Sequence, residues 1–478
     1  MALGALMCLG AAPAALAPIL ELAAARAEPG GGYGRMEGHG GPVKSLAAHR
    51  DADGRVQALT ASFDNALGFW IWADGAAERV VWLDGHEAAV TSAAFTPDGA
   101  AAVSGSDDFT VRFWRLQSGR STALRQHQGK VADVAVSADG RHAASASWDG
   151  TVALWRLPAP GDRAGAPELA HVLAGHAASV NAVAFAADGE TLFSASADGE
   201  VRRWRTADGA LVRVEARHGF GVNRLLPGPA DAAGAESWLA YGATDGVVRV
   251  LDLAGGDEIA ALTGDRRPIL ALALSPDGAR LAYGDGEGYI SVVAVDGWRL
   301  ERDFRAARQG PVWGLAYLDD AHLASSGLDD WASVWPVGAL EAIAAPAAGD
   351  GAARSFQVDP ETVSNGERQF LRKCSICHTV TQDGGRRAGP TLYAVFGRRA
   401  GAWPGYAYSD ALLGSDLVWD ETSLDKLFEI GPDHYTPGSK MPVQRIVRAS
   451  DRADLIAYLR EATAPEGAAR TEGAAAGE

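Results

Sequence analysis

Three stretches of the chain repeat one pattern: SGSDDFTVRFWRL (104–116), SASWDGTVALWRL (145–157) and SASADGEVRRWRT (194–206). Each reads as a strand, a tight turn that carries an aspartate, and a second strand that ends at a tryptophan. The aspartate and the tryptophan are six residues apart in every copy: Asp108–Trp114, Asp149–Trp155 and Asp198–Trp204. The pattern therefore predicts a series of antiparallel hairpins.

Weaker copies of the pattern extend over residues 35–340. They keep the six-residue spacing at Asp64–Trp70, Asp245–Leu251, Glu287–Val293 and Asp329–Trp335. The seven anchor positions are 41 to 49 residues apart, and this period is typical of four-stranded propeller blades. We expect residues 31–37 to add the outer strand of the last blade, because closing the ring removes free sheet edges.

The repeats resemble the WD-repeat family over about 310 residues, 31–340. In that family a His, a Ser, the turn Asp and the Trp form a buried hydrogen-bonded set in each blade. The sets that the resemblance implies here are His86, Ser106, Asp108 and Trp114, and His176, Ser196, Asp198 and Trp204. A buried carboxylate needs such donors. We therefore expect His39, His86 and His176 to be structural rather than metal ligands.

The last part of the chain contains a short cysteine motif. The chain has three cysteines, of which Cys374 and Cys377 lie in Cys-Ser-Ile-Cys-His, ending at His378. A disulfide-rich scaffold is therefore excluded. The motif is read as covalent attachment of a c-type haem, with the histidine as an iron ligand. A thioredoxin-like pair would need a βαβ context, which is missing. A zinc site would need further ligands, and only His434 is available.

The opposite side of such an iron needs a second ligand or stays open. Only Met441 of the four methionines lies in this part of the chain, in the loop PGSKMP (437–442). A thioether from this loop would complete His/Met ligation, which raises the potential and suits electron transfer. His434 is the alternative ligand.

Residues 358–464 resemble class I c-type cytochromes of the mitochondrial kind, through CSICHTVTQDGGRRAGPTLYAVFGRRAGAWPGYAYSDALLGSDLVW, PGSKM and RADLIAYL. The resemblance implies one haem c on Cys374 and Cys377, with His378 and Met441 on the iron and no catalytic residue. It also implies that the carbonyl of Pro390 orients His378. The residues that it implies for the haem propionates are Arg398, Tyr406, Tyr408 and Trp419. Gly366 and Phe370 of the first helix should cross the last helix at Leu455 and Tyr458.

The chain departs from this family around the haem. Leu412 stands where an Asn is usual, Leu427–Phe428 replace a usual Tyr, and Val443 replaces a usual aromatic residue. An extra residue lies between Trp419 and Met441. We therefore expect a drier haem pocket, with fewer hydrogen bonds, than the family norm.

The charge excludes one class of partner and leaves others open. The net charge is −17, and nucleic-acid binding requires a basic face. From residue 351 onward 15 Lys and Arg stand against 17 Asp and Glu, so the propeller carries most of the negative charge. The family docks through a ring of lysines, part of which remains in Lys373, Arg387, Lys440 and Arg448. The acidic propeller either docks on these basic residues, or its charge only keeps the protein soluble. We favour the second interpretation.

The apolar start of the chain predicts export. Residues 2–20 are almost wholly apolar and Ala25-Arg26-Ala27 supplies a cleavage pattern, so residues 1–27 read as a signal peptide. A membrane association is expected only if this leader stays uncleaved. Residues 341–357 read as a linker and 465–478 as a disordered tail, both rich in Ala and Gly. The predicted location is the periplasm.

The sequence thus predicts a multidomain protein, an all-β seven-bladed propeller followed by a small all-α cytochrome c domain. Its predicted function is to carry single electrons through one His/Met-ligated haem to redox partner proteins, with the propeller as a docking scaffold. One alternative is an oxidoreductase whose propeller holds a second cofactor or a substrate and uses the haem domain as its electron outlet. Another is a haem-based sensor, in which Met441 leaves the iron.

Overall fold

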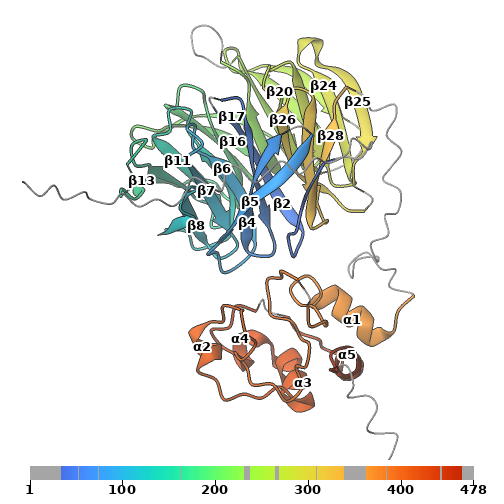
Figure 1. Ribbon diagram of the computed structural model, residues 1–478. Coiled ribbons are helices and arrows are strands. Elements are labelled where there is room, and N and C mark those ends of the chain that lie inside the picture. The colour runs from blue at the N-terminus through green and yellow to red at the C-terminus, as the bar shows by residue number, and fades with distance from the viewer. Residues whose placement is uncertain are drawn as a thin grey trace, which may run out of the picture. The chain divides into compact units, whose positions relative to one another are not determined.

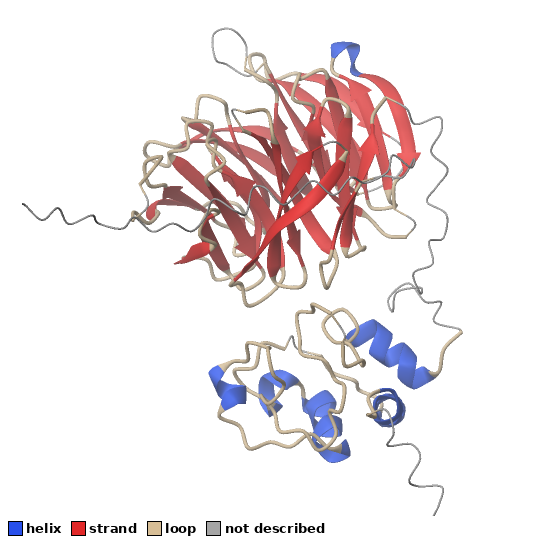
Figure 2. Cartoon of the chain, in the orientation of Figure 1, coloured by secondary structure: helices blue, strands red, loops and turns tan. Residues whose placement is uncertain are grey.

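The structure, a computed structural model, describes residues 34–338 and 362–465, apart from 52, 74, 163, 231–236, 264–267, 308, 384 and 442–443. The predicted leader (1–27) and linker (341–357) lie outside the described residues, as does the predicted tail after Pro465. Strands make up the first described part and helices the second (Figures 1 and 2). No described helix has the length and apolar character needed to cross a membrane.

The first part is a ring of seven four-stranded antiparallel sheets, as the repeats predict. The innermost strands are β2 (Val43–Arg50), β6 (Val90–Phe95), β10 (Val131–Val136), β14 (Val180–Phe185), β18 (Val222–Pro227), β22 (Ile269–Leu274) and β26 (Val312–Asp319). The second strands are β3 (Val56–Ser62), β7 (Ala101–Ser106), β11 (His142–Ser147), β15 (Thr191–Ser196), β19 (Trp238–Ala243), β23 (Arg280–Asp285) and β27 (His322–Gly327).

The two outer positions of each blade complete the sheets. The third strands are β4 (Ala66–Ala73), β8 (Thr110–Arg115), β12 (Val152–Arg156), β16 (Glu200–Arg205), β20 (Val247–Asp252), β24 (Tyr289–Ala294) and β28 (Trp331–Pro336). The outermost strands are β5 (Ala76–Asp84), β9 (Arg120–Arg125), β13 (Glu168–Leu173), β17 (Leu211–Arg217), β21 (Glu258–Thr263), β25 (Arg299–Arg305) and β1 (Arg35–Glu37). A short 3₁₀ turn, η1 (Asp296–Trp298), precedes β25.

The ring closes through β1, which is the first strand in sequence and the outer strand of the last blade. It pairs antiparallel with β28, with Met36 opposite Ala332, and the Met36 side chain is fully buried. This strand confirms the predicted closure for the described residues. Because two distant segments share one sheet, separating them would expose a buried methionine and two sheet edges.

The blades are held together by apolar side chains between neighbouring sheets. Val103 and Phe113 of one blade pack against Val134 and Trp155 of the next, and all four are buried. Burial of each such side chain stabilises the fold by about 1.5–3 kcal/mol. The turn after Asp149 needs a left-handed residue, and Gly150 takes φ 86° there, a conformation that glycine adopts without strain.

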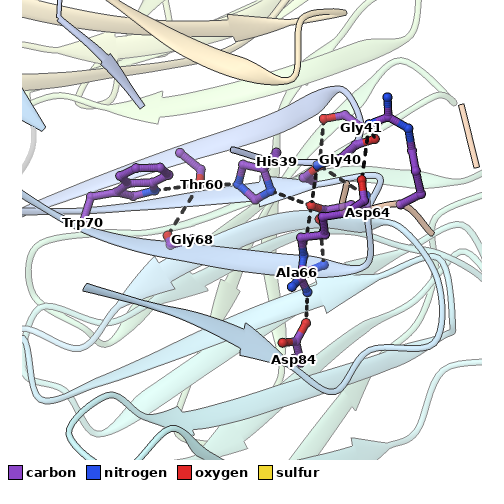
Figure 3. Close-up of polar contacts among 12 residues, drawn as sticks. His39, Gly40, Gly41, Thr60, Asp64, Ala66, Gly68, Trp70 and Asp84 are labelled. Carbon is purple, nitrogen blue, oxygen red and sulfur yellow. Dashed lines mark hydrogen bonds and ion pairs between the residues drawn. The ribbon is translucent and has the colours of Figure 1, made fainter. Parts of the chain in front are cut away.

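Each well-preserved blade contains a hydrogen-bonded set of a histidine, an aspartate, a tryptophan and a hydroxyl-bearing residue. In the first blade His39 Nδ1 lies 3.0 Å from Asp64 Oδ2 and its Nε2 lies 2.6 Å from Thr60 Oγ1 (Figure 3). Trp70 Nε1 donates to the same Thr60 oxygen at 2.8 Å (Figure 3). Both nitrogens of His39 are therefore engaged inside the blade, which fits a structural role.

The predicted serine in these sets was wrong by two residues. His86 Nε2 and Trp114 Nε1 both contact Ser104 Oγ at 2.8 Å, whereas Ser106 accepts from the Asp108 N–H and donates to the Ala88 carbonyl. The two serines share one strand face, but only the earlier one is level with the indole. In the other blade, Ser194 likewise takes the place predicted for Ser196.

One further set contains a histidine that no Gly-His pair marks in the sequence. His127 contacts Asp149 at 3.1 Å and Ser145 at 2.8 Å, and Trp155 donates to Ser145 at 3.0 Å. Gln126 precedes His127, at the place where other blades have the glycine of a Gly-His pair.

The absence of a preceding glycine explains why His127 escapes a search for Gly-His pairs. The residue before it is Gln126, whereas Gly38, Gly85 and Gly175 precede the other three histidines. The hydrogen bonds of the set do not involve that preceding residue. The set therefore forms in this blade although one of its sequence markers is missing.

The second part of the chain is a small helical domain (Figure 2). Its helices are α1 (Asn365–Lys373), α2 (Asp410–Leu413), α3 (Glu421–Ile430), α4 (Pro432–Tyr435) and α5 (Ala449–Ala462). Helices α1 and α5 cross at Gly366, where a Cβ atom would collide with the Asp454 carbonyl and with Tyr458. The rings of Phe370 and Tyr458 lie 5.6 Å apart at the same crossing, as the resemblance implies.

Candidate haem site

Helix α1 presents the cysteine motif at its carboxyl end. Ser364 caps the start of the helix by accepting the Glu367 N–H, and Cys374 is the residue at which the helix ends. The next turn brings the N–H groups of Cys377 and His378 onto the Cys374 carbonyl, at 3.0 and 2.8 Å. Both thiols and the imidazole are therefore held in one compact turn.

The orientation of His378 is fixed by a backbone carbonyl. Its Nδ1–H donates to the Pro390 oxygen at 2.7 Å, the hydrogen bond that the resemblance implies. Such a bond fixes the tautomer and leaves Nε2 free for a metal. Gly389 packs so closely on the ring that a Cβ atom there would collide with it. Burial lowers the pKa of His378, which favours the neutral imidazole that binds iron.

The two thiols and His378 line a largely apolar cavity. Its apolar wall within this domain comprises Leu392, Val395, Leu412, Trp419, Leu424, Leu427, Phe428 and Leu459. Met441 lines the same cavity and packs against the domain core. His434 does not line it; this histidine is exposed and pairs with Asp433 at 2.7 Å. The arrangement thus favours Met441 over His434 as the second axial ligand.

A polar edge of the cavity carries three of the residues proposed for the propionates. Arg398 donates to the carbonyls of Thr391 and Tyr393, at 2.7 and 2.9 Å. The Tyr406 hydroxyl donates to the Ala388 carbonyl at 2.6 Å, and its ring lies 4.8 Å from that of Tyr408. Burial raises the pKa of both tyrosines, that of Tyr406 to about 12. Both phenols therefore stay protonated as hydrogen-bond donors.

The fourth of these residues, Trp419, joins the loop that carries Arg398. The Trp419 N–H donates to the Arg398 carbonyl at 3.0 Å, and the Gly397 N–H donates to the Trp419 carbonyl at 2.8 Å. These bonds hold the two side chains beside the same cavity. The Ser409 hydroxyl is also buried at the cavity, without a hydrogen-bond partner among the described residues. Nothing in its sequence context marks it.

The departures from the family lie where they affect the cavity. Leu412, Leu427 and Phe428 all line it, in agreement with the expectation of fewer polar groups. Val443, the remaining departure, lies outside the described residues. A haem has an apolar macrocycle and two carboxylates, so a cavity with apolar walls and a polar edge of Arg and Tyr fits it.

The thiols do not resemble a redox or a zinc pair. Burial raises the pKa of Cys374 to about 12 and also raises that of Cys377, whereas the reactive cysteine of a redox pair acts as a thiolate. Among the described residues, the one cluster of potential metal-binding side chains is His176, Asp198 and Glu200 in the propeller. The donor set at residues 374–378 therefore fits covalent attachment of haem.

Comparison with known proteins agrees with this site. Residues 363–463 match the family model of cytochrome c. A cytochrome c of Sesamum indicum is 43% identical over 108 residues, covering 23% of this chain and 96% of that protein. A cytochrome c of Theileria parva is 44% identical over 100 residues, covering 21% of this chain and 85% of that protein.

The chain belongs to the cytochrome c family through its carboxyl-terminal domain. Membership implies covalently bound haem c and haem-based electron transfer. The propeller matches a separate family model, the WD domain, G-beta repeat, at residues 78–115, 119–156 and 167–205. The WD40 β-propeller domain of Doa1 superposes with a TM-score of 0.53 at 17% identity, over 63% of this chain and 95% of that one. This likeness shows the fold of the propeller, and such repeats support a protein-interaction scaffold.

Proposed function

We propose that this protein is an exported monohaem cytochrome that carries single electrons between redox proteins. The observation that carries the proposal is that His378, Met441 and both thiols line one cavity, with His378 held by Pro390. A bound haem c supplies an iron that cycles between the ferric and ferrous states. His378 and Met441 would both ligate this iron and leave no coordination site for water, which favours electron transfer over bond-breaking chemistry.

The number of haems follows from the cysteines. Attachment uses two thiols, and the chain has a single Cys-x-x-Cys-His motif at residues 374–378. The third cysteine, Cys8, lies in the predicted leader. We therefore propose one haem per chain. Mass spectrometry of the purified protein tests this directly: a single haem on the peptide containing Cys374 and Cys377 is expected, and a second haem or none would contradict it.

The propeller is proposed to dock protein partners rather than to hold a cofactor. Three aromatic side chains at the turns of the propeller are 44 to 54% exposed: Phe109, Trp148 and Phe220. Exposed aromatic residues are enriched at protein interfaces. Replacing Trp148 and Phe220 by Ala should reduce cross-linking of the full chain to its partners in cells. Leu300 and Val212, equally exposed on outer strands, provide matched Ala controls.

We propose that the leader at residues 1–27 directs export. This proposal can be tested independently of haem binding. Sequencing the amino terminus of the mature protein should place the first residue near Glu28, in a periplasmic fraction. An intact leader in a membrane fraction would instead support anchoring.

Gas binding distinguishes the carrier from a sensor. With Met441 fixed on the iron, the reduced protein should not bind carbon monoxide at neutral pH. Rapid binding would favour the sensor. Detection of a second chromophore in the purified protein would favour the oxidoreductase whose propeller holds a cofactor.

A further inference from the structure

Trp403 packs on the guanidinium of Arg398 in the loop beside the haem cavity. The Cζ atom of Arg398 lies 5.0 Å from the centre of the Trp403 ring, a distance at which an aromatic face attracts a cation. Arg398 lines the cavity, whereas Trp403 does not. The half-buried indole therefore covers the arginine side chain from outside the cavity.

The backbone around Trp403 is restricted on both sides. Trp403 precedes Pro404, and the residue before a proline is confined to extended conformations. On the other side, Gly401 packs so closely on the Leu412 carbonyl that a Cβ atom there would collide with it. The loop therefore presents the indole in a defined position.

Tyr393 supports both members of the contact. Its ring lies edge-on to that of Trp403, with the centroids 6.4 Å apart and the planes at 76°, an arrangement that aromatic pairs favour. The Tyr393 carbonyl also accepts a hydrogen bond from Arg398 Nη1 at 2.9 Å. The indole and the guanidinium thus rest on one residue, so movement of either affects the other.

Arg398 brings a positive charge to the cavity without an acidic partner. Its Nη1 and Nη2 groups donate to the backbone carbonyls of Tyr393 and Thr391, and no carboxylate pairs with it among the described residues. A guanidinium has five N–H donors, so donors remain for a further acceptor. Burial lowers the pKa of Arg398, yet a guanidinium stays charged at neutral pH.

The backbone of Trp403 contacts a second residue of the polar edge. Its N–H donates to the Tyr408 hydroxyl oxygen at 3.3 Å, and Tyr408 lines the cavity. Because the oxygen accepts this bond, the phenolic proton is left for another acceptor. A side-chain substitution at Trp403 keeps this backbone contact and removes only the one with Arg398.

We propose that Trp403 is a positioning residue that keeps the charge of Arg398 available to a haem propionate and thereby raises the reduction potential of the iron. The inference rests on the proposed one-haem carrier. The ferric iron carries one more positive charge than the ferrous iron, so a nearby cation disfavours the ferric form. The indole keeps water from one side of the guanidinium, and a charge acts more strongly where less water screens it.

The first test is the reduction potential of the full-length haem protein with Trp403→Leu. At a fixed applied potential, the ratio of ferric to ferrous protein should rise about threefold, which corresponds to a decrease of about 28 mV at about 59 mV per tenfold for one electron. Trp403→Phe keeps an aromatic face toward Arg398 and should recover most of this shift. An unchanged potential in the Leu variant would overturn the proposal.

A double-mutant cycle shows whether Trp403 acts through Arg398. In a protein that already carries Arg398→Gln, Trp403→Leu should cause no further shift, because coupled residues are not additive. An equal shift in both backgrounds would mean that Trp403 influences the iron by another route, and the proposal would be wrong.

Phe396→Leu is the matched control for the loss of an aromatic ring. Phe396 makes another arginine contact in this domain, with 5.5 Å between Arg460 Cζ and the ring centre, and it does not line the cavity. Its replacement should leave the potential unchanged. A shift as large as that of Trp403→Leu would trace the effect to a general loss of packing and overturn the proposal.

Chemical labelling tests directly whether the indole shields Arg398. Phenylglyoxal modifies arginine side chains, and peptide mass spectrometry of the full-length haem protein measures the rate at each site. The rate at Arg398 should rise severalfold in Trp403→Leu, whereas the rate at Arg372, which is exposed on α1, should not change. Equal rates at Arg398 in the two proteins would contradict the shielding.

Haem content separates failure of this inference from failure of the proposed function. A wild-type protein without haem on the peptide containing Cys374 and Cys377 would contradict the proposed carrier. Haem-loaded wild-type and Trp403→Leu proteins of equal potential would contradict only the role of Trp403. If the Leu variant loses its haem, Trp403→Met takes its place in each measurement.

Discussion

His378 and Pro390 are joined by a 2.7 Å hydrogen bond between the imidazole Nδ1–H and the proline carbonyl. Because the carbonyl can only accept, the bond defines the tautomer of the ring and directs Nε2 into the cavity that Met441 also lines. A histidine held in this way is a better electron-donating ligand. The conformation of the loop that carries Pro390 should therefore influence the reduction potential of the bound iron.

Replacement of Met441 by Ala should leave haem attachment intact, because Cys374, Cys377 and His378 are unchanged. It should lower the reduction potential by on the order of 0.1 V or more and give a high-spin component, since axial ligands are the strongest determinant of potential. A redox titration with absorption spectra measures both. His434→Ala is the control and should behave like the wild type; the reverse pattern would assign the ligand to His434.

Gly389→Ala should disturb the same site from the other side of the imidazole. The added methyl group would collide with His378, so the ring must move or lose its hydrogen bond to Pro390. We expect a lower yield of haem-bound protein and a shifted potential. Gly414→Ala is a suitable control, because its Cβ would meet only the Asp410 carbonyl at 3.4 Å. Equal yields and potentials for the two variants would refute the packing argument.

Ser104→Ala should destabilise the propeller more than a surface serine does. Trp114 Nε1 loses the oxygen that accepts its hydrogen bond, and His86 Nε2 loses the hydroxyl that donates to it; each buried unsatisfied group costs about 1–3 kcal/mol. Urea unfolding followed by tryptophan fluorescence measures the change. Ser118→Ala, at an exposed turn, should change stability by less than about 0.5 kcal/mol. Similar losses for both variants would mean that the buried set contributes little.

Stability of the propeller should fall as the pH drops below about 6.5. Burial lowers the pKa of His86, His127 and His176, against the opposing effect of their aspartates. Each histidine then binds a proton more tightly in the unfolded chain, so folding loses at most about 1.4 kcal/mol per pH unit for each. Urea unfolding at pH 7.5, 6.5 and 5.5 checks the slope.

A variant tests whether these histidines cause the slope. His127→Asn should lower stability at pH 7.5 but make its decline toward pH 5.5 shallower, because one titrating group is gone. Stability that stays constant or rises over this range in the wild type would contradict the assigned pKa directions. Below about pH 4 a second loss is expected, since hydrogen bonds hold the pKa of Asp198 below its usual value despite its burial.

The repeats predict the propeller well because each blade needs the same turn and the same anchor. Even the blades that carry Leu251 or Val293 in place of Trp form complete sheets, since alternating apolar residues suffice for burial. The sequence could not distinguish Ser104 from Ser106, because both lie on one strand face and only the register decides which meets the indole. His127 was missed for a different reason. Its partner Asp149 and the nearby Trp155 follow the repeat pattern, but the residue before it is Gln126 rather than the glycine of the other blades.

The haem site was predictable to a different degree for each residue. Cys374, Cys377 and His378 follow from a contiguous motif, and Met441 follows from the scarcity of methionine. The partner of His378 depends on a fold that brings Pro390 back over the ring, so only the family resemblance could suggest it. Ser409 lies in an unremarkable stretch, and its buried hydroxyl is visible only in three dimensions.

The proposed electron carrier is best tested by a spectroelectrochemical titration of the mature full-length protein, with its haem content determined in the same sample. We predict one haem c per chain, a single one-electron step at high potential, and low-spin spectra in both oxidation states. A high-spin form in either state, a low potential or a second redox centre would contradict a carrier with His378 and Met441 as fixed ligands.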